Sequence, residues 1–192
     1  MVIYLCEVLG DMVKTLAEEI LHRNENLIII DGMSCSGKTT LAVKLAAVLD
    51  CDIIHIDDFF LPKNRQIAET AGNIDAERFK RQVTEHLGNE LFYQKYDCKT
   101  GTYADTVRVR QGRVIIEGAY SCHKSLGLEG GLRIFLEIDK QEQRRRVIER
   151  EAYPQGYFDI WIPRETEYFE KCDVKQNCNI KISGNIITNM VL

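Results

Sequence analysis

The chain has 192 residues, of which 45% are hydrophobic and 28% charged, and its net charge is −4. This length predicts a single domain over residues 1–192 with a substantial core. The acidic balance disfavours nucleic acid as a partner, and no apolar run reaches the roughly 18 residues that a membrane-spanning helix needs. Residues 1–21 lack the basic start and apolar run of a secretion signal, and their apolar spacing instead predicts an amphipathic helix.

The cysteine pattern bears on the cellular compartment. Seven cysteines are scattered along the chain, and no two of them form a CxxC pair; they stand at positions 6, 35, 51, 98, 122, 172 and 178. An odd, scattered set is a poor candidate for a zinc site or a disulfide framework. Free thiols in a reducing compartment are the simplest interpretation, so we expect a cytoplasmic protein with no membrane partner.

Short apolar runs alternate with helical patterns along the chain. Strands are predicted at residues 27–31, 52–56, 113–117, 132–138 and 179–183. The helices predicted between them lie at residues 41–49, 75–87, 140–151 and 165–172. This alternation predicts an α/β fold in which helices joined by right-handed crossovers cover both faces of a parallel sheet. Residues 88–112 are polar with little periodicity, and we interpret them as an insertion near the site.

A glycine-rich segment between the first strand and the first helix of this pattern matches GxxxxGK[ST]. Its glycines allow a tight turn in which several backbone N–H groups converge on one anion beside a helix N-terminus. Lys38 is expected to reach the β- and γ-phosphates, and the Thr39 hydroxyl to coordinate Mg²⁺. We therefore expect ATP and Mg²⁺ as cofactors. The predicted cofactor-binding residues of the segment are Gly32, Ser34, Cys35, Ser36, Gly37, Lys38, Thr39 and Thr40.

A phosphate loop does not define the reaction by itself. A GTPase would carry DxxG and NKxD motifs, and the nearest approach to NKxD, at residues 170–173, lacks the asparagine. A motor or remodelling ATPase usually needs a longer chain with its own hydrolytic residues. A small kinase needs little more than an acceptor pocket and a closing lid, so the sequence favours a kinase.

Acidic residues follow two of the predicted strands. Asp57 and Asp58 follow the second strand, and Glu117 ends the third. Sites of open parallel sheets lie at the carboxyl ends of the strands, where one acid is expected to hold Mg²⁺ and another to accept the proton of an acceptor hydroxyl. Because neighbours on an extended strand point to opposite sides, only one of the two aspartates is expected to face the phosphates. His55 is interpreted as structural.

The helix predicted at residues 140–151 is strongly basic. Arginines that close over a triphosphate would neutralise the charge that develops during transfer. We interpret Arg146 as functional and Arg144 as part of a solvated charged face. Arg150 is compatible with both roles and is included among the predicted cofactor-binding residues. Residues 140–156 are accordingly the predicted lid region.

Taken in order, these motifs resemble the uridine kinase-like branch of the P-loop nucleoside kinases, from residue 27 to about residue 184. The matching pieces are GMSCSGKTTLA, HIDDFF, NIDAERF, YDCKTG, VIIEGAYS, the RRV of the basic helix, and NIKISG. The resemblance implies a P-loop NTPase fold whose five-stranded parallel sheet has the order 2-3-1-4-5 and carries a small mobile lid. It also implies Mg-ATP as donor and a sugar hydroxyl as acceptor, with residues 88–112 on the acceptor side.

The resemblance also implies roles for single residues. Asp57, the first aspartate of DDFF, looks like the catalytic base, and Glu117 looks like the Mg²⁺-linked acid. Asp75 looks like the acid that grips ribose hydroxyls, which would select a diol because an unpaired buried polar group is costly. Lys38 and Arg146 complete the predicted catalytic set. The implied substrate-binding residues are Asp57, Phe59, Phe60, Asp75 and Tyr96.

The sequence departs from the family pattern at two places. Uridine kinases follow their Tyr-Asp with an aromatic residue and, three residues later, a histidine that reads the pyrimidine; Cys98 and Gly101 stand there instead. In the lid, Glu149 replaces a family arginine, and the later lid arginines have no counterpart in residues 151–156.

Three functions therefore stay open. The first is a kinase whose small-molecule acceptor is a nucleoside of the uridine or cytidine type. The second, favoured by Gly101, is a kinase of another small alcohol such as a vitamin precursor or a sugar. The third is an ATP-binding regulatory module, which would not need Asp57 or Asp75. Arg78 and Arg108 are left without an assigned role, and a homo-oligomer with the N-terminal helix at its contact is one open arrangement.

Overall fold

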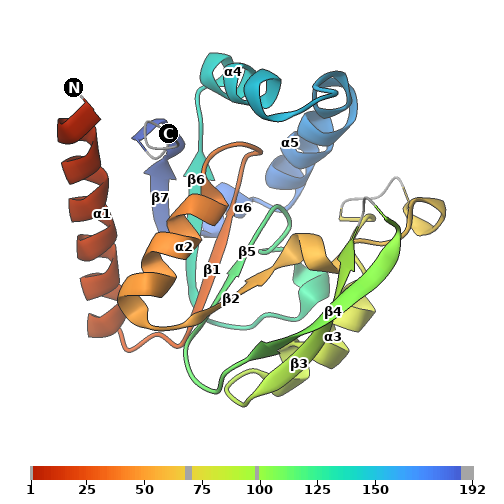
Figure 1. Cartoon of the computed structure of the whole chain (residues 1–192), viewed down its shortest axis with the longest axis horizontal. Coiled ribbons are helices and arrows are strands. Elements are labelled where there is room, and N and C mark those ends of the chain that lie inside the picture. The colour runs from red at the N-terminus through yellow and green to blue at the C-terminus, as the bar shows by residue number, and fades with distance from the viewer. Residues whose placement is uncertain (1, 68–70, 98–99, 187–192) are drawn as a thin grey trace.

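The computed structural model describes residues 2–67, 71–97 and 100–186. Its centre is a five-stranded parallel sheet in the order β2-β5-β1-β6-β7 (Figure 1). Two further strands, β3 and β4, form a separate hairpin, so in order of appearance the five sheet strands lie 2-3-1-4-5, as predicted. The sheet strands are β1 (Leu27–Gly32), β2 (Asp52–His55), β5 (Val114–Glu117), β6 (Leu132–Glu137) and β7 (Ile180–Ser183).

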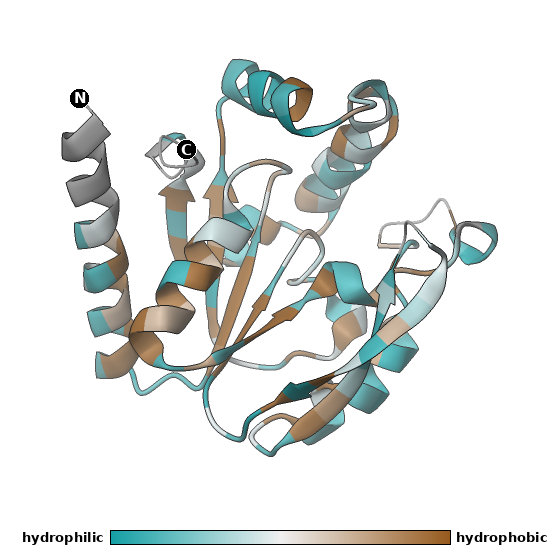
Figure 2. Cartoon of the chain, in the orientation of Figure 1, coloured by the Kyte–Doolittle hydropathy of each residue, from teal (hydrophilic) through white to brown (hydrophobic). Residues whose placement is uncertain are grey.

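Both faces of the sheet are covered, because β1 sends alternate side chains into two separate cores. Ile28 and Ile30 belong to the core beneath α1 (Val2–His22) and α2 (Lys38–Leu49), whereas Ile29 belongs to the core on the other face. Figure 2 shows apolar strands at the centre of the molecule. Burial on both sides explains why β1 is an unbroken apolar run rather than an alternating one.

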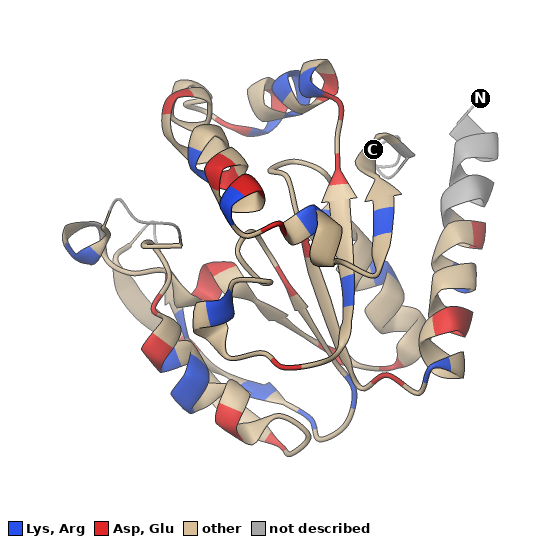
Figure 3. Ribbon diagram, turned by 180° about the vertical axis from the view of Figure 1, so that it is seen from behind, with Lys and Arg blue, Asp and Glu red and all other residues tan. Residues whose placement is uncertain are grey.

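The second face and the carboxyl edge of the sheet carry the remaining helices. α3 (Ala76–Gln82), α5 (Ile162–Lys171) and α6 (Val174–Asn177) contribute residues to the core that contains Ile29. α4 (Lys140–Arg150) lies beyond the carboxyl ends of the strands, next to the start of α5 (Figure 1). Both signs of charge are interspersed along α4 and α5, as Figure 3 shows from behind.

Residues 88–112 contain a hairpin that the sequence pattern did not predict. β3 (Leu91–Asp97) pairs antiparallel with β4 (Thr102–Val109). Leu91, Tyr93 and Tyr96 of β3 and Val109 of β4 are its buried positions, and the register shifts between Gln94 and Tyr96. The extra residue at this shift breaks the period of two from which a strand is recognised in a sequence.

Several predicted elements end earlier or begin earlier than expected. The helix predicted at 75–87 ends at Gln82 and continues as a 3₁₀ turn at Thr84–His86. The strand predicted at 52–56 ends at His55 and is followed by a 3₁₀ turn at Ile56–Phe59. A π-helical turn at Tyr157–Trp161 precedes α5.

The structure also bears on membrane-spanning helices and on disulfide bonds. Within the three described ranges, no helix combines the length and the apolar character that crossing a bilayer requires. The five cysteines whose side chains are described are free thiols, and the sulfurs of Cys122 and Cys178 approach to 4.0 Å. Cys98, which stands at a departure from the family pattern, lies outside the described residues.

Candidate active site

The phosphate loop leaves β1 at Gly32 and enters α2 at Lys38. A Cβ atom on Gly32 would lie 2.1 Å from the carbonyl oxygen of Leu136, so only glycine fits against β6 there. Gly37 and Cys35 both have left-handed backbones, with φ of 98° and 61°. The Cys35 conformation costs about 1–2 kcal/mol for a residue with a side chain, so the surrounding contacts must hold it.

Five backbone N–H groups of this loop have no hydrogen-bond partner in the described part of the chain and are free to bind a ligand. They belong to Cys35, Gly37, Lys38, Thr39 and Thr40. The buried Ser36 hydroxyl is likewise unpaired among the described residues. Unpaired donors converging at a helix N-terminus form an anion site, so the loop fits a phosphate group.

Lys38 supplies the positive charge of the loop. Its Nζ donates to the carbonyl oxygens of Gly32 (2.8 Å) and Met33 (2.9 Å), so the side chain folds back over the loop. Its charge opposes the rise in pKa of three nearby carboxyl groups, those of Asp31, Asp57 and Glu165. The lysine is therefore the shared counter-charge of an acidic site.

Thr39 and Glu117, the two predicted metal ligands, face each other. The Thr39 hydroxyl donates to Glu117 Oε1 at 3.0 Å, and His55 Nδ1 lies 2.6 Å from the same oxygen. The hydrogen bond with Glu117 raises the pKa of His55, which makes this histidine a partner of the acid and not an isolated structural residue. Among the described residues no three His, Cys, Asp or Glu side chains form a metal cage. Mg²⁺ usually takes only one or two carboxylates in addition to phosphate oxygens, so this pair fits it.

The structure separates the two aspartates that follow β2. Asp58 is 3% exposed, accepts a hydrogen bond from the Tyr93 hydroxyl at 2.9 Å and pairs with Lys95 at 3.2 Å. Asp57 is exposed, and its pKa is raised, first by the desolvation that the surrounding protein imposes and then by the charge of Glu117. Their divergence was predicted from an extended strand but occurs in a 3₁₀ turn. Asp57 alone is available to a ligand.

The aromatic residues predicted to bind the acceptor differ in how deeply they are buried. Phe59 is fully buried against Phe79 and Tyr93, so it supports the site from within the core and does not line it, contrary to expectation. Phe60 is only partly buried. Tyr96 is also buried, with its ring edge-on to Tyr103 at 5.5 Å between centroids.

Asp75 is held next to the turn that carries Asp57. Its backbone N–H donates to the carbonyl oxygen of Phe59 at 2.8 Å, and its side chain caps α3 by accepting from the N–H of Arg78 at 3.1 Å. The carboxylate is partly exposed, with a side-chain accessibility of 16%. Its capping role leaves acceptor capacity on a carboxylate, which has about four lone-pair sites.

The two arginines without an assigned role differ in their surroundings. Arg78 is buried, its guanidinium lies 4.4 Å from the Phe59 ring centre, and it donates to the carbonyl oxygens of Asp58 and Gln94. It therefore joins the aspartate turn to the hairpin. Arg108 is exposed and pairs with Glu90 at the surface.

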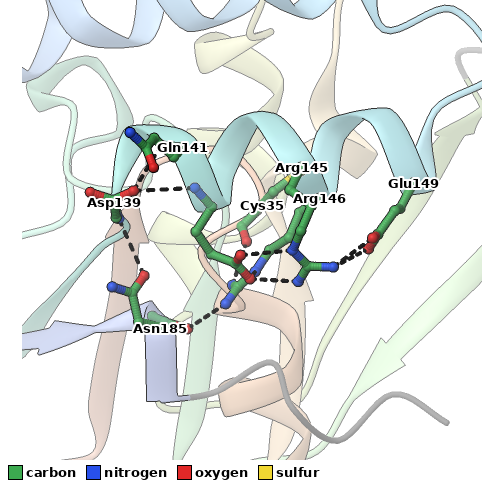
Figure 4. A network of polar contacts seen from close by, with 9 residues as sticks. Cys35, Asp139, Gln141, Arg145, Arg146, Glu149 and Asn185 are labelled. Carbon is green, nitrogen blue, oxygen red and sulfur yellow. Dashed lines mark hydrogen bonds and ion pairs between the residues drawn. The ribbon is translucent and has the colours of Figure 1, made fainter.

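Arg146 was predicted to be catalytic, and in the structure each of its three guanidinium nitrogens donates to protein. It is 6% exposed, pairs with Glu142 at 2.7 Å, and donates to the carbonyl oxygens of Cys35 and Gly184 at 3.0 Å each (Figure 4). A guanidinium whose donors are used in this way braces the loop from outside. Arg146 thus holds the loop in this structure, and its catalytic role stays a prediction.

The three other arginines of α4, among them Arg144 and Arg150, are exposed. Arg144 stacks on Phe158 at 4.4 Å, in agreement with a surface role. Arg150 donates to Glu151 and to the hydroxyl of Tyr157. Its predicted contact with the nucleotide stays a prediction.

Two buried carboxyl groups beside the loop were missed by the sequence analysis. Asp31 is fully buried and accepts from the N–H groups of Gly32 and Cys122 and from the Tyr168 hydroxyl. Glu165 is 6% exposed and accepts two hydrogen bonds from Ser34. Burial raises the pKa of both. The acid at the end of the first apolar strand was a usable signal for Asp31, whereas Glu165 stands among ordinary helix charges.

Comparisons with known proteins agree with this geometry. No family model matches the sequence. The chain superposes on a possible uridine kinase from Bacillus stearothermophilus with a TM-score of 0.72, covering 91% of this chain and 98% of that one at 21% identity. The chain has the fold of a uridine kinase-like P-loop kinase. The fold that the motifs implied by resemblance is therefore confirmed.

Two curated proteins match the amino-acid sequence of this chain. Uridine-cytidine kinase C of Dictyostelium discoideum is 27% identical over 152 residues, 66% of this chain and 34% of the relative. A tRNA dimethylallyltransferase of Halothermothrix orenii is 25% identical over 146 residues, 72% of this chain and 43% of the relative. The chain thus spans less than half the length of either relative, and the second name shows that related sequences carry out other chemistry.

Proposed function

We propose that the protein is an ATP-dependent kinase that transfers the γ-phosphoryl group to a hydroxyl of a small metabolite, with a nucleoside of the uridine or cytidine type as the first candidate. The observation that carries the proposal is the accessible Asp57, in the turn directly after β2, facing the charges of Lys38 and Glu117 beside a loop with five free N–H donors. A binding module needs the loop but has no use for a carboxylate at this place. A kinase needs a group there that accepts the proton of the acceptor hydroxyl.

Each group has a role in this proposal. The loop amides and Lys38 hold the triphosphate, and Thr39 with Glu117 would hold Mg²⁺. Mg²⁺ would neutralise charge on the phosphate oxygens during transfer. Asp57 accepts the proton of the acceptor hydroxyl, while Asp75 receives a hydrogen bond from a neighbouring hydroxyl. Arg150 approaches the phosphates from α4.

The nucleoside assignment is supported by the uridine-cytidine kinase relative and by the acid at position 75. A second candidate is a kinase of another small alcohol. Gly101 and not histidine stands at the pyrimidine-reading position of the family, in the turn of the hairpin that also carries Tyr96. This observation keeps vitamin precursors and sugars among the acceptors to be tested.

An acceptor panel tests the proposal. ADP release from Mg-ATP is measured with uridine, cytidine, purine nucleosides, deoxynucleosides, pantothenate and simple sugars, and Asp57→Asn serves as the matched variant. Turnover that depends on one nucleoside and is lost in the variant supports the first candidate. Turnover with a non-nucleoside alone supports the second. Nucleotide binding without acceptor-dependent turnover, and biological activity that survives Asp57→Asn, would favour a regulatory module instead.

A further inference from the structure

Ser34 occupies an unusual position in the phosphate loop, because all of its polar groups are already used. Its N–H donates to Glu165 Oε2 at 2.8 Å and its hydroxyl donates to Glu165 Oε1 at 2.5 Å. Its carbonyl oxygen accepts from Gln143 Nε2 at 3.0 Å. The prediction that Ser34 binds the nucleotide would require these bonds to break, whereas the free N–H groups begin at the next residue, Cys35.

Glu165 is one of two links between α5 and the start of the loop. Tyr168, three residues further along α5, donates its hydroxyl to Asp31 at 2.7 Å. α5 therefore contacts the chain on both sides of Gly32, through Asp31 before it and Ser34 after it. Residues three apart share a helix face, so one face of α5 holds this stretch of backbone.

A carboxylate is an expensive residue to bury at this place. Glu165 is 6% exposed, and burial raises its pKa. An apolar side chain would pack α5 against the sheet without the cost of desolvating a charge. The bidentate contact with Ser34 is the interaction that an apolar residue could not supply.

We propose that Glu165 is a positioning residue of the phosphate loop, which fixes Ser34 so that the free N–H groups after it already face a common anion before nucleotide binds. This inference rests on the proposed nucleotide-binding function and adds a residue to it. Cys35 follows Ser34 directly and is held in the left-handed conformation. Because Ser34 is fixed, the left-handed conformation of Cys35 is already ordered in the folded protein. Nucleotide binding then does not have to supply the free energy of ordering it.

The proposal is tested by nucleotide affinity, which needs no acceptor. Dissociation constants for Mg-ADP and Mg-ATP are measured by calorimetry for wild type, Glu165→Ala, Glu165→Asp and Glu165→Gln. Removing or shortening the side chain should raise both constants at least about tenfold. Glutamine should stay within about threefold, because its carbonyl accepts from the Ser34 N–H and its amide donates to the Ser34 hydroxyl. Glu167→Ala is the matched control, since Glu167 is exposed on the same helix and pairs with Lys171.

A double-mutant cycle shows whether Glu165 acts through Ser34. The effect of Ser34→Ala should be smaller in the Glu165→Ala background than alone, because the partners of one interaction are not additive. In the free wild-type protein the amide hydrogen of Ser34 should exchange slowly with solvent, and faster in Glu165→Asp. This exchange measurement applies even if Glu165→Ala does not fold.

Three results would overturn the proposal: unchanged nucleotide affinity in folded Glu165→Asp or Glu165→Ala, full additivity in the cycle, or a rapidly exchanging Ser34 amide in wild type. The proposed function fails separately. A wild type that binds nucleotide but phosphorylates no acceptor contradicts the kinase assignment and leaves the role of Glu165 standing. A wild type that binds no nucleotide contradicts both.

Discussion

The chemistry of the site depends on how the fold treats single acidic residues. Asp57 and Asp58 are adjacent, yet one is exposed and the other is 3% exposed and paired. The sequence predicted that they would diverge but could not say which would be buried, because this depends on Tyr93 and Lys95 of a hairpin that its pattern concealed. The role of Glu165 could not be predicted either, because its partner Ser34 lies 131 residues away in the sequence.

The buried Asp58 gives a prediction about stability. Tyr93→Phe removes the hydroxyl that donates to Asp58 and leaves a buried carboxylate with one fewer partner. We expect a loss of about 1–3 kcal/mol in the free energy of unfolding, measured by urea denaturation. Tyr153→Phe is the control, because Tyr153 is 87% exposed and should show no change. Equal stability of wild type and Tyr93→Phe would contradict the described role of the hydroxyl.

At the scale of elements, the sequence located the sheet strands well, because each is a short apolar run buried on both faces. It failed for the β3–β4 hairpin, whose register shift hides the strand period. In α4 it distinguished Arg146 from Arg144 but did not predict the contacts that Arg146 makes. Three of its arginines are adjacent in sequence, but the helix turns only Arg146 inward, toward the carbonyl oxygens of Cys35 and Gly184.

The charge network of α4 predicts an acid-dependent loss of stability. Hydrogen bonds from Arg145, together with Arg146, lower the pKa of Glu142 to about 2, from its usual 4.5. A folded-state pKa below the unfolded one stabilises the fold above pH 4.5, and this contribution disappears as the pH falls toward 2. Glu142→Gln should therefore be less stable than wild type at pH 7, and the difference should vanish near pH 2. A difference that stays constant across this range, in urea unfolding at each pH, would contradict the assignment.

The end of β7 is packed against the phosphate loop, which gives a second prediction at this scale. A Cβ atom on Gly184 would lie 2.2 Å from the carbonyl oxygen of Ser36. Gly184→Ala must therefore displace one of the two backbones, at a cost of about 1–3 kcal/mol, and should also weaken nucleotide binding. Thermal unfolding and ADP calorimetry measure both effects. Gly10→Ala is the control, because a Cβ there meets nothing within 4 Å. Equal stability and equal ADP affinity of the two variants would contradict the described contact between Gly184 and Ser36.

At the scale of the whole molecule, the sequence predicted the fold class and the order of the main sheet. The alternation of strands and helices predicted a parallel sheet covered on both faces, whereas the strand order came from the resemblance to the uridine kinase-like branch. The acceptor could not be predicted, because the side chains that we propose to select it lie on the aspartate turn, at the start of α3 and on the hairpin, whose relative placement is a tertiary property. Cys98, which stands where the family has an aromatic residue after its Tyr-Asp, lies outside the described residues.

The central claim is that this site moves a phosphoryl group from ATP to an organic hydroxyl. It is tested most directly by following the label of γ-labelled Mg-ATP into product, with the acceptor panel present, in wild type and Asp57→Asn. We predict that label enters a phosphorylated acceptor in wild type. In the variant, transfer should fall at least about 100-fold, within the range that a general base contributes, while ATP binding persists. Label found only in inorganic phosphate, or equal transfer by Asp57→Asn, would contradict the account.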